Sequence, residues 1–522
     1  MKYYGAIVCL TSNNKNFILC VTKKIQEATT LNIENYIEKD IIRKVKIVEY
    51  IFEHKTLVIR QLAKKLDITF NTVKKDISML SIQLMPYLDQ YELSATEVTM
   101  IFTKHTTRYD LIKEIYSESK FLKVVARYLL GDTNYLSIVD EEFVSVTKAF
   151  KIKKEVENYL KEENILDNNN KIKPNELLYR FIFISIWLRT DFFSEYIDKE
   201  SYSYAQKFVD KMFDVFDVNY LPNDREYSFF LYHTYLCLER SDMNLVLTNY
   251  KEPRINSSYN KLSEISELIL GDRHLSDQNL KLLAIFCRLL MLKSKNFSII
   301  NMNYHLDRQE IIEEQPDVQQ LIKALETEFN IPLRNNMIFE IPFIYFIYSL
   351  WENTQNYFVE RNYFLTIHQV GIAKRLEKVL KQWKKLYLPN ENIHFNKTSI
   401  IRLVSEIHSA LLSNHMQRHL CMIVAENELS HIIYRESLKR WINSEFITID
   451  NQMYYSGDHI PVYKNDWPHF IIYERSLLTE EEFNIADSTL FYISRNSLLQ
   501  DIKSIRDYLY DKSLSINQRK TM

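Results

Sequence analysis

The sequence predicts a mainly helical, multidomain protein. Glycine supplies only 5 of the 522 residues, although tight turns and phosphate-binding loops depend on it. A turn-rich β fold, a Gly-rich dinucleotide loop and a Walker loop are therefore excluded, and long helices joined by polar loops remain. A chain of this length is too long for one core, which predicts roughly three to five domains.

The cysteines and the hydropathy pattern predict a cytoplasmic protein. No apolar run approaches the ~18 residues that span a bilayer, and residues 1–34 are interpreted as an irregular extension without a signal-peptide pattern. We expect no membrane association, metal or cofactor. The cysteines are scattered without a CxxC pair, which is typical of free thiols in a reducing compartment; they are Cys9, Cys20, Cys237, Cys287 and Cys421.

Two segments are locally basic, although the net charge of −2 gives no global attraction for nucleic acid. Arg60–Asp76 and Val146–Lys161 each carry five Lys or Arg against two Asp or Glu, a local charge of +3. Such a segment is either an electrostatic footprint for DNA or a solvated helix face, and charge alone favours the solvated face.

The chain between Leu57 and Leu84 predicts a helix-turn-helix. A preceding helix is indicated by the apolar spacing of Ile41–Phe52. The turn is expected at Asp67-Ile68, and Thr69 is expected to cap the second helix. The predicted buried positions are Leu57, Leu62, Ala63 and Leu66 in the first helix and Val73, Ile77 and Leu80 in the second.

The outer face of the second helix carries the side chains that a recognition helix needs. Asn reads base edges, Lys contacts phosphates, and short hydroxyl groups do either. The alternating, β-branched segment Tyr91–Thr103 predicts a β wing, so the unit is interpreted as a winged helix-turn-helix. Its candidate DNA-binding residues are Thr69, Asn71, Thr72, Lys74, Lys75 and Ser78.

A second winged helix-turn-helix is predicted downstream. Phe121–Leu130 and Ser137–Phe143 are expected to be helices, Ser145 to cap a helix that runs to Leu160, and Asp167–Lys173 to form a turn and wing. An amphipathic helix that packs on the first unit is an alternative, because two glutamates dilute the basic face. The predicted inward residues are Phe150, Val156 and Leu160, and the outward DNA-binding candidates are Thr147, Lys148, Lys151 and Lys154.

An internal repeat occupies the middle of the chain. Two pairs of segments align at an offset of 113 residues. The first pair is FVDKMFDVFDV (208–218) with LIKALETEFNI (321–331), and the second is FLYHTYLCLE (230–239) with FIYFIYSLWE (343–352). Two copies of one helical domain are therefore predicted, and His233 of the first copy aligns with Phe346 of the second. A lone His on an apolar helix is more often a packed core residue, but its phosphorylation would add about two negative charges and force repacking.

From Cys421 the pattern changes to a small α/β unit. CMIVAE (421–426), FITIDNQMYY (446–455) and HFIIYE (469–474) predict strands, and ELSHIIYRESLKRWI (428–442) predicts a helix. Asp501–Tyr510 is expected to be a closing helix.

These motifs, in this order, resemble the Mga/AtxA family of virulence and global transcription regulators of Gram-positive bacteria. The resemblance covers about residues 35–515 and is carried by KDIIRKVKIVEYI (39–51), QLAKKLDITFNTVKKDISML (61–80), SVTKAFKIKKEVENYL (145–160) and NELLYRF (175–181). It implies winged helix-turn-helix units at 35–110 and 111–175, helical-bundle phosphotransferase regulatory domains (PRDs) at 176–300 and 301–412, and an enzyme IIB-like domain at 413–522.

The resemblance also implies how such a protein works. Double-stranded DNA is the expected ligand, and the C-terminal domain is expected to form a homodimer. Phosphocarrier proteins of the sugar phosphotransferase system (PTS) are expected partners that phosphorylate PRD histidines. His233 stands where a regulatory histidine of the first copy is expected, and weaker candidates are His274, His305 and His368.

The IIB-like domain departs from the family pattern. The loop after its first strand, Glu426-Asn427-Glu428, has no cysteine that could carry phosphate, and Cys421 is expected to precede the strand. The domain is therefore expected to be structural rather than a phosphate relay.

Two other functions are compatible with parts of the sequence. A protein-interaction scaffold with degenerate helix-turn-helix units would form a partner complex without binding DNA. An enzyme is disfavoured, because no nucleophile–base pair or phosphate loop is apparent, and His415 and His419 lack the intervening Glu of a zincin helix. No catalytic residue is predicted.

Overall fold

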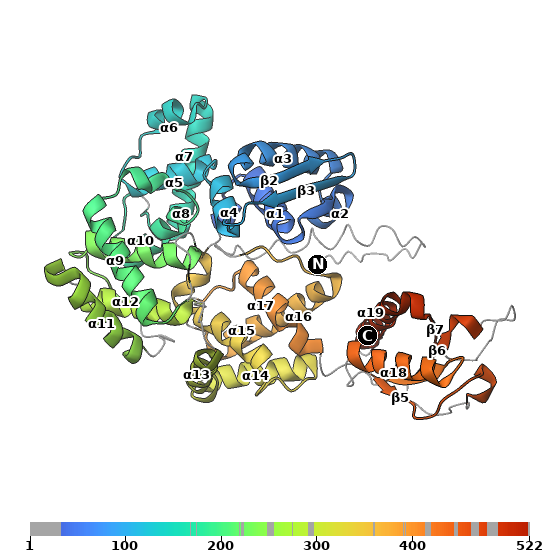
Figure 1. Ribbon diagram of the computed structural model, residues 1–522. Helices are drawn as coiled ribbons and strands as arrows, with labels where there is room; N and C mark the ends of the chain where they lie inside the picture. The colour runs from blue at the N-terminus through green and yellow to red at the C-terminus, as the bar shows by residue number, and fades with distance from the viewer. Residues whose placement is uncertain are drawn as a thin grey trace, which may run out of the picture. The chain divides into compact units, whose positions relative to one another are not determined.

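The computed structural model describes residues 33–519, apart from 168, 174, 219, 221–223, 248–254, 274, 291–296, 359–360, 390, 392, 413–418, 443–446, 461–468 and 478–488. The predicted extension up to residue 32, His274 and His415 lie outside the described residues. The described chain is mainly helical (Figure 1), as the scarcity of glycine predicts. Among these residues, no helix combines the length and apolar character that a bilayer crossing requires.

The chain divides into two compact units. The first comprises the described residues up to Glu314 together with Ile344–Phe364 and Leu388–Arg402. The second comprises Gln315–Phe343, Leu365–Tyr387 and the described residues from Leu403 onward. The second predicted helical copy therefore contributes segments to both units.

The first helix-turn-helix is completed by a small antiparallel sheet. The strand order is β1-β3-β2, and β2 and β3 form the predicted wing hairpin (Figure 1). Leu57 is buried, but it lies in strand β1 rather than in the predicted helix, because it pairs with Val98 of β3. The elements are η1 (Ile33–Asn35), α1 (Lys39–His54), β1 (Thr56–Val58), α2 (Ile59–Leu66), α3 (Phe70–Gln83), η2 (Met85–Tyr87), β2 (Leu88–Leu93) and β3 (Glu97–Phe102).

Four helices follow, and the last two form the second helix-turn-helix. They are α4 (Arg108–Tyr116), α5 (Lys120–Leu129), α6 (Tyr135–Glu142) and α7 (Val146–Glu162). The predicted second wing amounts to one antiparallel bridge between Leu166 and Ile172, closed by hydrogen bonds between Asp167 and Lys171. This short hairpin is too small to form a wing like that of the first unit.

In the described residues, each predicted copy contains five α-helices, although the short helical turns between them stand at different places. The shared Phe-x-Tyr-x-x-Tyr pattern lies in α10 and α15, where Phe230 and Phe343 are fully buried. The first copy contains α8 (Glu176–Trp187), η3 (Phe192–Glu195), α9 (Lys199–Val215), α10 (Arg225–Glu239), α11 (Asn256–Leu270), η4 (Gly271–Arg273) and α12 (Asp277–Leu289). The second contains α13 (Phe297–Arg308), a π-helical turn η5 (Gln309–Glu313), α14 (Pro316–Phe329), α15 (Met337–Tyr348), η6 (Trp351–Asn356), α16 (Ile367–Tyr387) and α17 (Lys397–Leu412).

The C-terminal part contains a parallel four-stranded sheet in the order β5-β4-β6-β7. Both faces of β4 are buried, since Cys421 and Ile423 pack with α18 and α19 while Met422 and Val424 pack with Tyr454. Cys421 therefore lies inside the strand rather than before it. The elements are β4 (His419–Val424), α18 (Glu428–Trp441), β5 (Ile447–Ile449), η7 (Gly457–His459), β6 (His469–Glu474), η8 (Arg475–Leu477), β7 (Thr489–Ile493), η9 (Arg495–Ser497) and α19 (Leu498–Arg519).

Two strand predictions in this part need correction. The predicted strand 446–455 extends in the described residues only over β5, because the chain bends at Asn451 and Gln452. Strand β7 was not predicted, because its TLFYI sequence is short and lacks the flanking turn residues on which strand predictions depend.

Candidate nucleic-acid interface

The turn of the first helix-turn-helix is set by two residues. Asp67 adopts the left-handed conformation (φ 55°, ψ 47°) that ends α2. Thr69 then caps α3, because its hydroxyl oxygen accepts the backbone N–H of Thr72 at 3.2 Å. Helix α3 is held by the predicted core stripe of Val73, Ile77 and Leu80, all fully buried, whereas Leu66 is only half-buried. The opposite face of α3 is thereby left to solvent.

The predicted DNA-binding residues of α3 differ in how accessible they are. Asn71 and Lys75 are exposed, and Thr72 and Lys74 are partly exposed. Thr69 and Ser78 already use their hydroxyl groups locally, since Thr69 caps the helix and Ser78 donates to the Lys74 carbonyl at 3.1 Å. The Thr72 hydroxyl is also used locally, since it lies 2.8 Å from the Thr69 hydroxyl. Asn71, Lys74 and Lys75 are therefore the side chains most available to a groove.

Asp76 does not oppose the positive charge of this face. Its side chain is buried beneath α3 and forms an ion pair with Arg43 of α1, whose Nη2 lies 3.0 Å from Asp76 Oδ1. This pair also ties α3 to α1 across 33 residues of sequence. The segment Arg60–Asp76 therefore presents more positive charge to solvent than its residue count suggests.

Helix α2 adds two cations that the predicted site did not include. Arg60 and Lys64 are exposed on this helix. Both residues belong to the basic segment Arg60–Asp76, and the local charge of that segment is the sequence signal that could have identified them. Helices before a recognition helix cross the DNA backbone, so these residues are suited to phosphates.

The wing is acidic. Between Leu88 and Phe102 it contains Asp89, Glu92 and Glu97 and no Lys or Arg. Carboxylates at these positions repel phosphates, so α2 and α3 are better suited than the wing to contact DNA.

The second unit repeats the turn of the first at an offset of 76 residues. Phe143 adopts nearly the same left-handed conformation (φ 49°, ψ 49°) as Asp67. Ser145 caps α7 as Thr69 caps α3, with its hydroxyl accepting the N–H of Lys148 at 3.3 Å. The buried Ile138 corresponds to Leu62, and Ala149 corresponds to Val73. Two separate sequences thus build one helix-turn-helix geometry.

The outward face of α7 holds the predicted candidates and one unexpected aromatic ring. Thr147, Lys148, Lys151 and Lys154 are all exposed. The prediction that Phe150 points inward is wrong, since its side chain is 61% exposed. The predictions for Val156 and Leu160 are confirmed, and Ala149, Ile152 and Tyr159 complete the inward face. Phe150 stands one position, or about 100° of helix rotation, away from Ala149.

The two helix-turn-helix units are joined by direct contacts. The carboxylate of Glu38, which precedes α1, accepts hydrogen bonds from the Ser119 hydroxyl (2.6 Å) and the Phe121 N–H (3.1 Å) at the start of α5. The ring of Tyr36 stacks on Phe121 and contacts Tyr159 of α7. The two helix-turn-helix units therefore share a packed contact through Glu38 and Tyr36.

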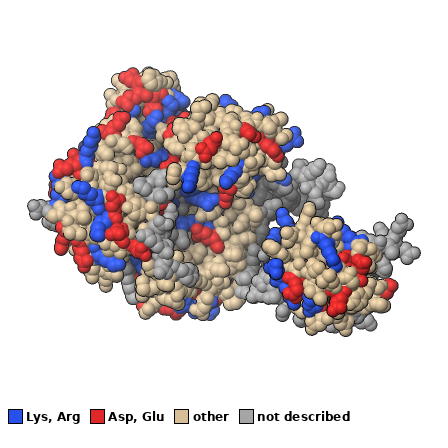
Figure 2. All heavy atoms as spheres, viewed as in Figure 1, with Lys and Arg blue, Asp and Glu red and all other residues tan. Residues whose placement is uncertain are grey.

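On the face shown in Figure 2, Lys and Arg side chains are interspersed with Asp and Glu. Because the net charge of the chain is −2, attraction to a polyanion depends on local groups such as those of α2, α3 and α7. Within the described residues, no cluster of three or more His, Cys, Asp or Glu side chains is arranged to hold a metal ion.

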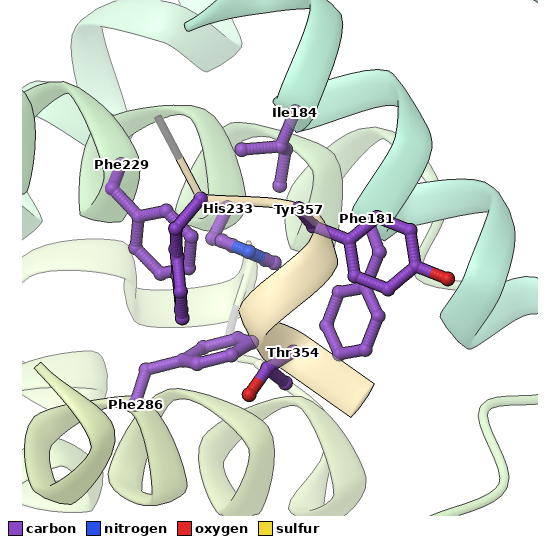
Figure 3. A pocket seen from close by; sticks show the side chains of 8 residues that line it. Phe181, Ile184, Phe229, His233, Phe286, Thr354 and Tyr357 are labelled. Carbon is purple, nitrogen blue, oxygen red and sulfur yellow. The ribbon is translucent and has the colours of Figure 1, made fainter. Parts of the chain in front are cut away.

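His233, the main regulatory candidate, lies in a closed aromatic environment. It is fully buried in α10, and neither ring nitrogen has a hydrogen-bond partner among the described residues. Burial, assisted by the charge of Arg180, lowers the pKa of His233 well below its usual range, so the ring is neutral. It lines a cavity of about 10 Å³, at the lower limit for one water. The lining side chains, shown in Figure 3, are Phe181, Ile184, Phe229, Phe286, Thr354, Tyr357 and Phe358.

The other predicted histidines are placed differently. His305 is exposed on α13. His368 is in α16, but its side chain, like all of His274, lies outside the described residues.

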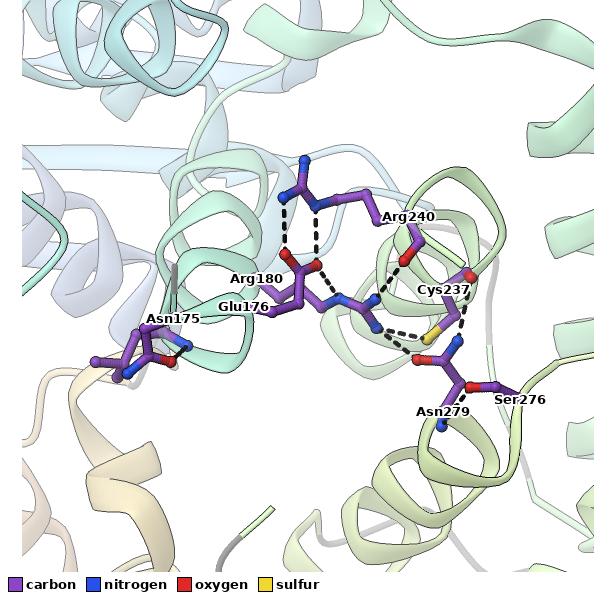
Figure 4. Close-up of polar contacts among 8 residues, drawn as sticks. Asn175, Glu176, Arg180, Cys237, Arg240, Ser276 and Asn279 are labelled. Carbon is purple, nitrogen blue, oxygen red and sulfur yellow. Dashed lines mark hydrogen bonds and ion pairs between the residues drawn. The ribbon is translucent and has the colours of Figure 1, made fainter. Parts of the chain in front are cut away.

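A buried polar network surrounds Arg180, as Figure 4 shows, and the charge of Arg180 acts on His233. The Arg180 guanidinium is fully buried and donates to Glu176 (2.6 Å), to Asn279 (2.8 Å) and to the Arg240 carbonyl (3.1 Å). Arg240 forms a second ion pair with Glu176 at 2.7 Å. These bonds lock α8, α10 and α12 together. No sequence motif indicates the network, because Arg180 and Asn279 lie 99 residues apart.

Comparison with known proteins identifies the first unit. A search of curated proteins finds no match to the chain. Residues 38–90 match the family model of the M protein trans-acting positive regulator (MGA) HTH domain. This match covers α1, α2, α3 and the beginning of β2. The chain therefore carries a helix-turn-helix of the Mga type, which indicates a DNA-binding transcription regulator.

Proposed function

We propose that this chain is a cytoplasmic regulator of transcription, not an enzyme, that binds double-stranded DNA through both helix-turn-helix units and is controlled through its PRD-like helical region. The observation that carries the proposal is the common turn geometry of α2–α3 and α6–α7, each with a hydroxyl cap and an outward face of Lys and Thr. Contacts through Glu38 and Tyr36 let the two units act on one duplex.

The connecting segment, defined as the described residues of Trp351–Phe364, supports control by the helical region. At one end, Thr354, Tyr357 and Phe358 line the His233 cavity. The Tyr357 hydroxyl also donates a 3.0 Å hydrogen bond to Glu163, which follows the last residue of α7. A change at His233 therefore reaches the end of a DNA-binding helix through one side chain.

The connecting segment also contacts the first helix-turn-helix unit. The backbone N–H of Asn362 donates to the Glu49 carboxylate at 3.0 Å, and Arg361 forms a 2.9 Å ion pair with Glu53. Phe364 packs edge-on against Tyr50 of α1. Both DNA-binding units are thus within reach of a signal that moves the connecting segment.

Phosphorylation of His233 by a PTS phosphocarrier is the proposed signal. A phosphoryl group cannot fit in a cavity of about 10 Å³, so modification requires the pocket to open and displaces Thr354 and Tyr357. The second copy has Phe346 at the corresponding position and cannot be modified there.

Transfer of labelled phosphate tests this signal. The full chain is incubated with the general PTS components and labelled phosphoenolpyruvate, and label should disappear in His233→Ala. DNA affinity is then compared with and without phosphorylation in the wild type and in Tyr357→Phe, which loses the bond to Glu163. We expect the response to be weaker in Tyr357→Phe. Label that persists in His233→Ala contradicts the assignment.

The C-terminal sheet is proposed to form a homodimer rather than to carry phosphate. Cys421 is buried in β4, and burial raises the pKa of its thiol far above the usual range. The Glu474 carboxylate accepts the N–H of Glu426 at 2.8 Å in the loop where a phosphate would bind, so the site is already occupied by an anion. Leu429 and Ile432 of α18 are exposed apolar side chains suited to a dimer contact. Sedimentation of the full chain and of Ile432→Glu tests the dimer.

The DNA-binding role is tested by the salt dependence of affinity. Each phosphate contact contributes about 0.9 to the slope of log K against log salt, so Lys74→Ala plus Lys75→Ala should reduce the slope by about 2. The control is Lys199→Ala plus Lys207→Ala, which removes the same charge from the exposed surface of α9. An unchanged slope would exclude α3 as the contact. Absence of binding to any duplex, together with a stable protein complex, would instead support the scaffold function.

A further inference from the structure

The first half of the recognition helix in the second unit contains exposed apolar side chains that the corresponding half of α3 lacks. Val146 is 55% exposed and Phe150 is 61% exposed. They lie four residues apart on α7 and therefore share one stripe of the helix surface. Phe143, at the turn, is 94% exposed. None of these side chains contributes to the core of the unit, so folding does not explain them.

The position of Phe150 is informative because the two units share one register. At the offset of 76 residues, Phe150 of α7 corresponds to Lys74 of α3, which is a predicted DNA contact. Both residues are in the first half of the recognition helix, the part that reaches base edges. An aromatic ring therefore stands where the first unit presents an ammonium group.

The surroundings of Phe150 favour a polyanion as the occupant of this face. Lys151 is adjacent in sequence, and Lys154 is one helical turn away in the same stripe. Thr147 precedes Phe150 by three residues and is exposed. The acidic Glu155 lies 4.0 Å from Lys151 at the flank of the face. The apolar stripe is thus bordered by cations rather than by the mixed polar rim of a protein contact.

The apolar group that the major groove of DNA offers is the 5-methyl group of thymine. Guanine, cytosine and adenine present hydrogen-bond donors and acceptors there, and side chains such as Phe recognise the thymine methyl by apolar contact. We propose that Phe150, with Val146 beside it, is a specificity-determining residue that reads a thymine methyl group. This inference rests on the proposed function, because it requires α7 to enter a major groove.

Duplexes that contain deoxyuridine in place of thymidine test the inference. Uracil pairs like thymine but lacks the methyl group. The probes are 40-base-pair duplexes that the wild-type full chain selects from a random-sequence pool, each made with thymidine and with deoxyuridine. Loss of one buried methyl contact should weaken wild-type binding by about fourfold.

Two variants complete the measurement. Phe150→Ala should bind the thymidine duplex about as weakly as the wild type binds the deoxyuridine duplex, and should no longer distinguish the two. Ile82→Ala is the control, because Ile82 is an apolar side chain, 76% exposed, near the end of α3 and away from its groove-facing first half. This control should retain the wild-type ratio between the two duplexes.

The possible outcomes separate the inference from the proposed function. Tight DNA binding with equal affinity for both duplexes overturns the thymine assignment alone. Full discrimination in Phe150→Ala overturns it too, because another residue would then read the methyl group. A variant that changes the sedimentation coefficient but not the DNA affinity shows that Phe150 covers a protein surface. Absence of binding to either duplex overturns the proposed function as well.

Discussion

Glu163 provides a prediction that can be worked out from the structure in detail. Its carboxyl is buried, and burial raises its pKa from 4.5 to about 7, partly offset by the hydrogen bond from Tyr357. The folded protein therefore holds a proton on Glu163 at a pH where the unfolded chain has released it. The resulting stability is fully present below pH 4.5 and is lost as the pH rises through about 7.

Substitution by Gln removes this titration and preserves the shape of the side chain. A pKa displacement from 4.5 to about 7 corresponds to about 3 kcal/mol. We expect the stability of Glu163→Gln relative to wild type to increase with pH, with about 2 kcal/mol of the change between pH 5 and pH 7 and a plateau above pH 8.

The assay must report on the region around α7, because a multidomain chain does not unfold in one step. The full chain is equilibrated in urea at each pH and labelled with a hydrogen-exchange pulse at one common pH, and peptides from α7 are analysed by mass spectrometry. Glu162→Gln is the control, since Glu162 is the exposed neighbour. A difference between Glu163→Gln and wild type that does not vary from pH 5 to pH 8 would refute the reasoning.

Three further substitutions test the fold around the site. His233→Leu should stabilise the chain by about 1–3 kcal/mol, because it removes two buried ring nitrogens without partners among the described residues. This difference in stability from the wild type should increase as the pH falls below about 6.5, because His233 binds a proton there in the unfolded chain but not in the folded one. Phe143→Gly should stabilise the α6–α7 region by about 1 kcal/mol in the same urea and hydrogen-exchange assay, because φ is 49° there; a loss in peptides from α6 and α7 would mean that the ring packs in solution. Asp76→Ala should cost about 2 kcal/mol in peptides from α1 and α3, because it leaves Arg43 partly buried without its carboxylate; an unchanged urea midpoint for these peptides would show that the pair is solvated.

Local signals made the first helix-turn-helix predictable. A cap such as Thr69, a turn residue such as Asp67 and a stripe such as Val73, Ile77 and Leu80 act within a few residues of one another, so the sequence displays them directly. The same signals gave Ser145 and most of α7. They fail for Phe150, because a large apolar side chain is ordinarily buried, whereas Phe150 lies one position outside the inward stripe of α7 and is exposed.

The sequence by itself therefore determined the helical class, the two capped recognition helices and the repeat that follows them. Only the tertiary structure decided which charges face solvent and how the parts are coupled. Asp76 is neutralised by a residue 33 positions away, and Tyr357 reaches Glu163 across 194 positions. Contacts at such separations leave no periodicity in the sequence, because they depend on how separately formed helices pack. For the same reason, only the folded chain shows that the pocket of His233 and the end of α7 share one tyrosine.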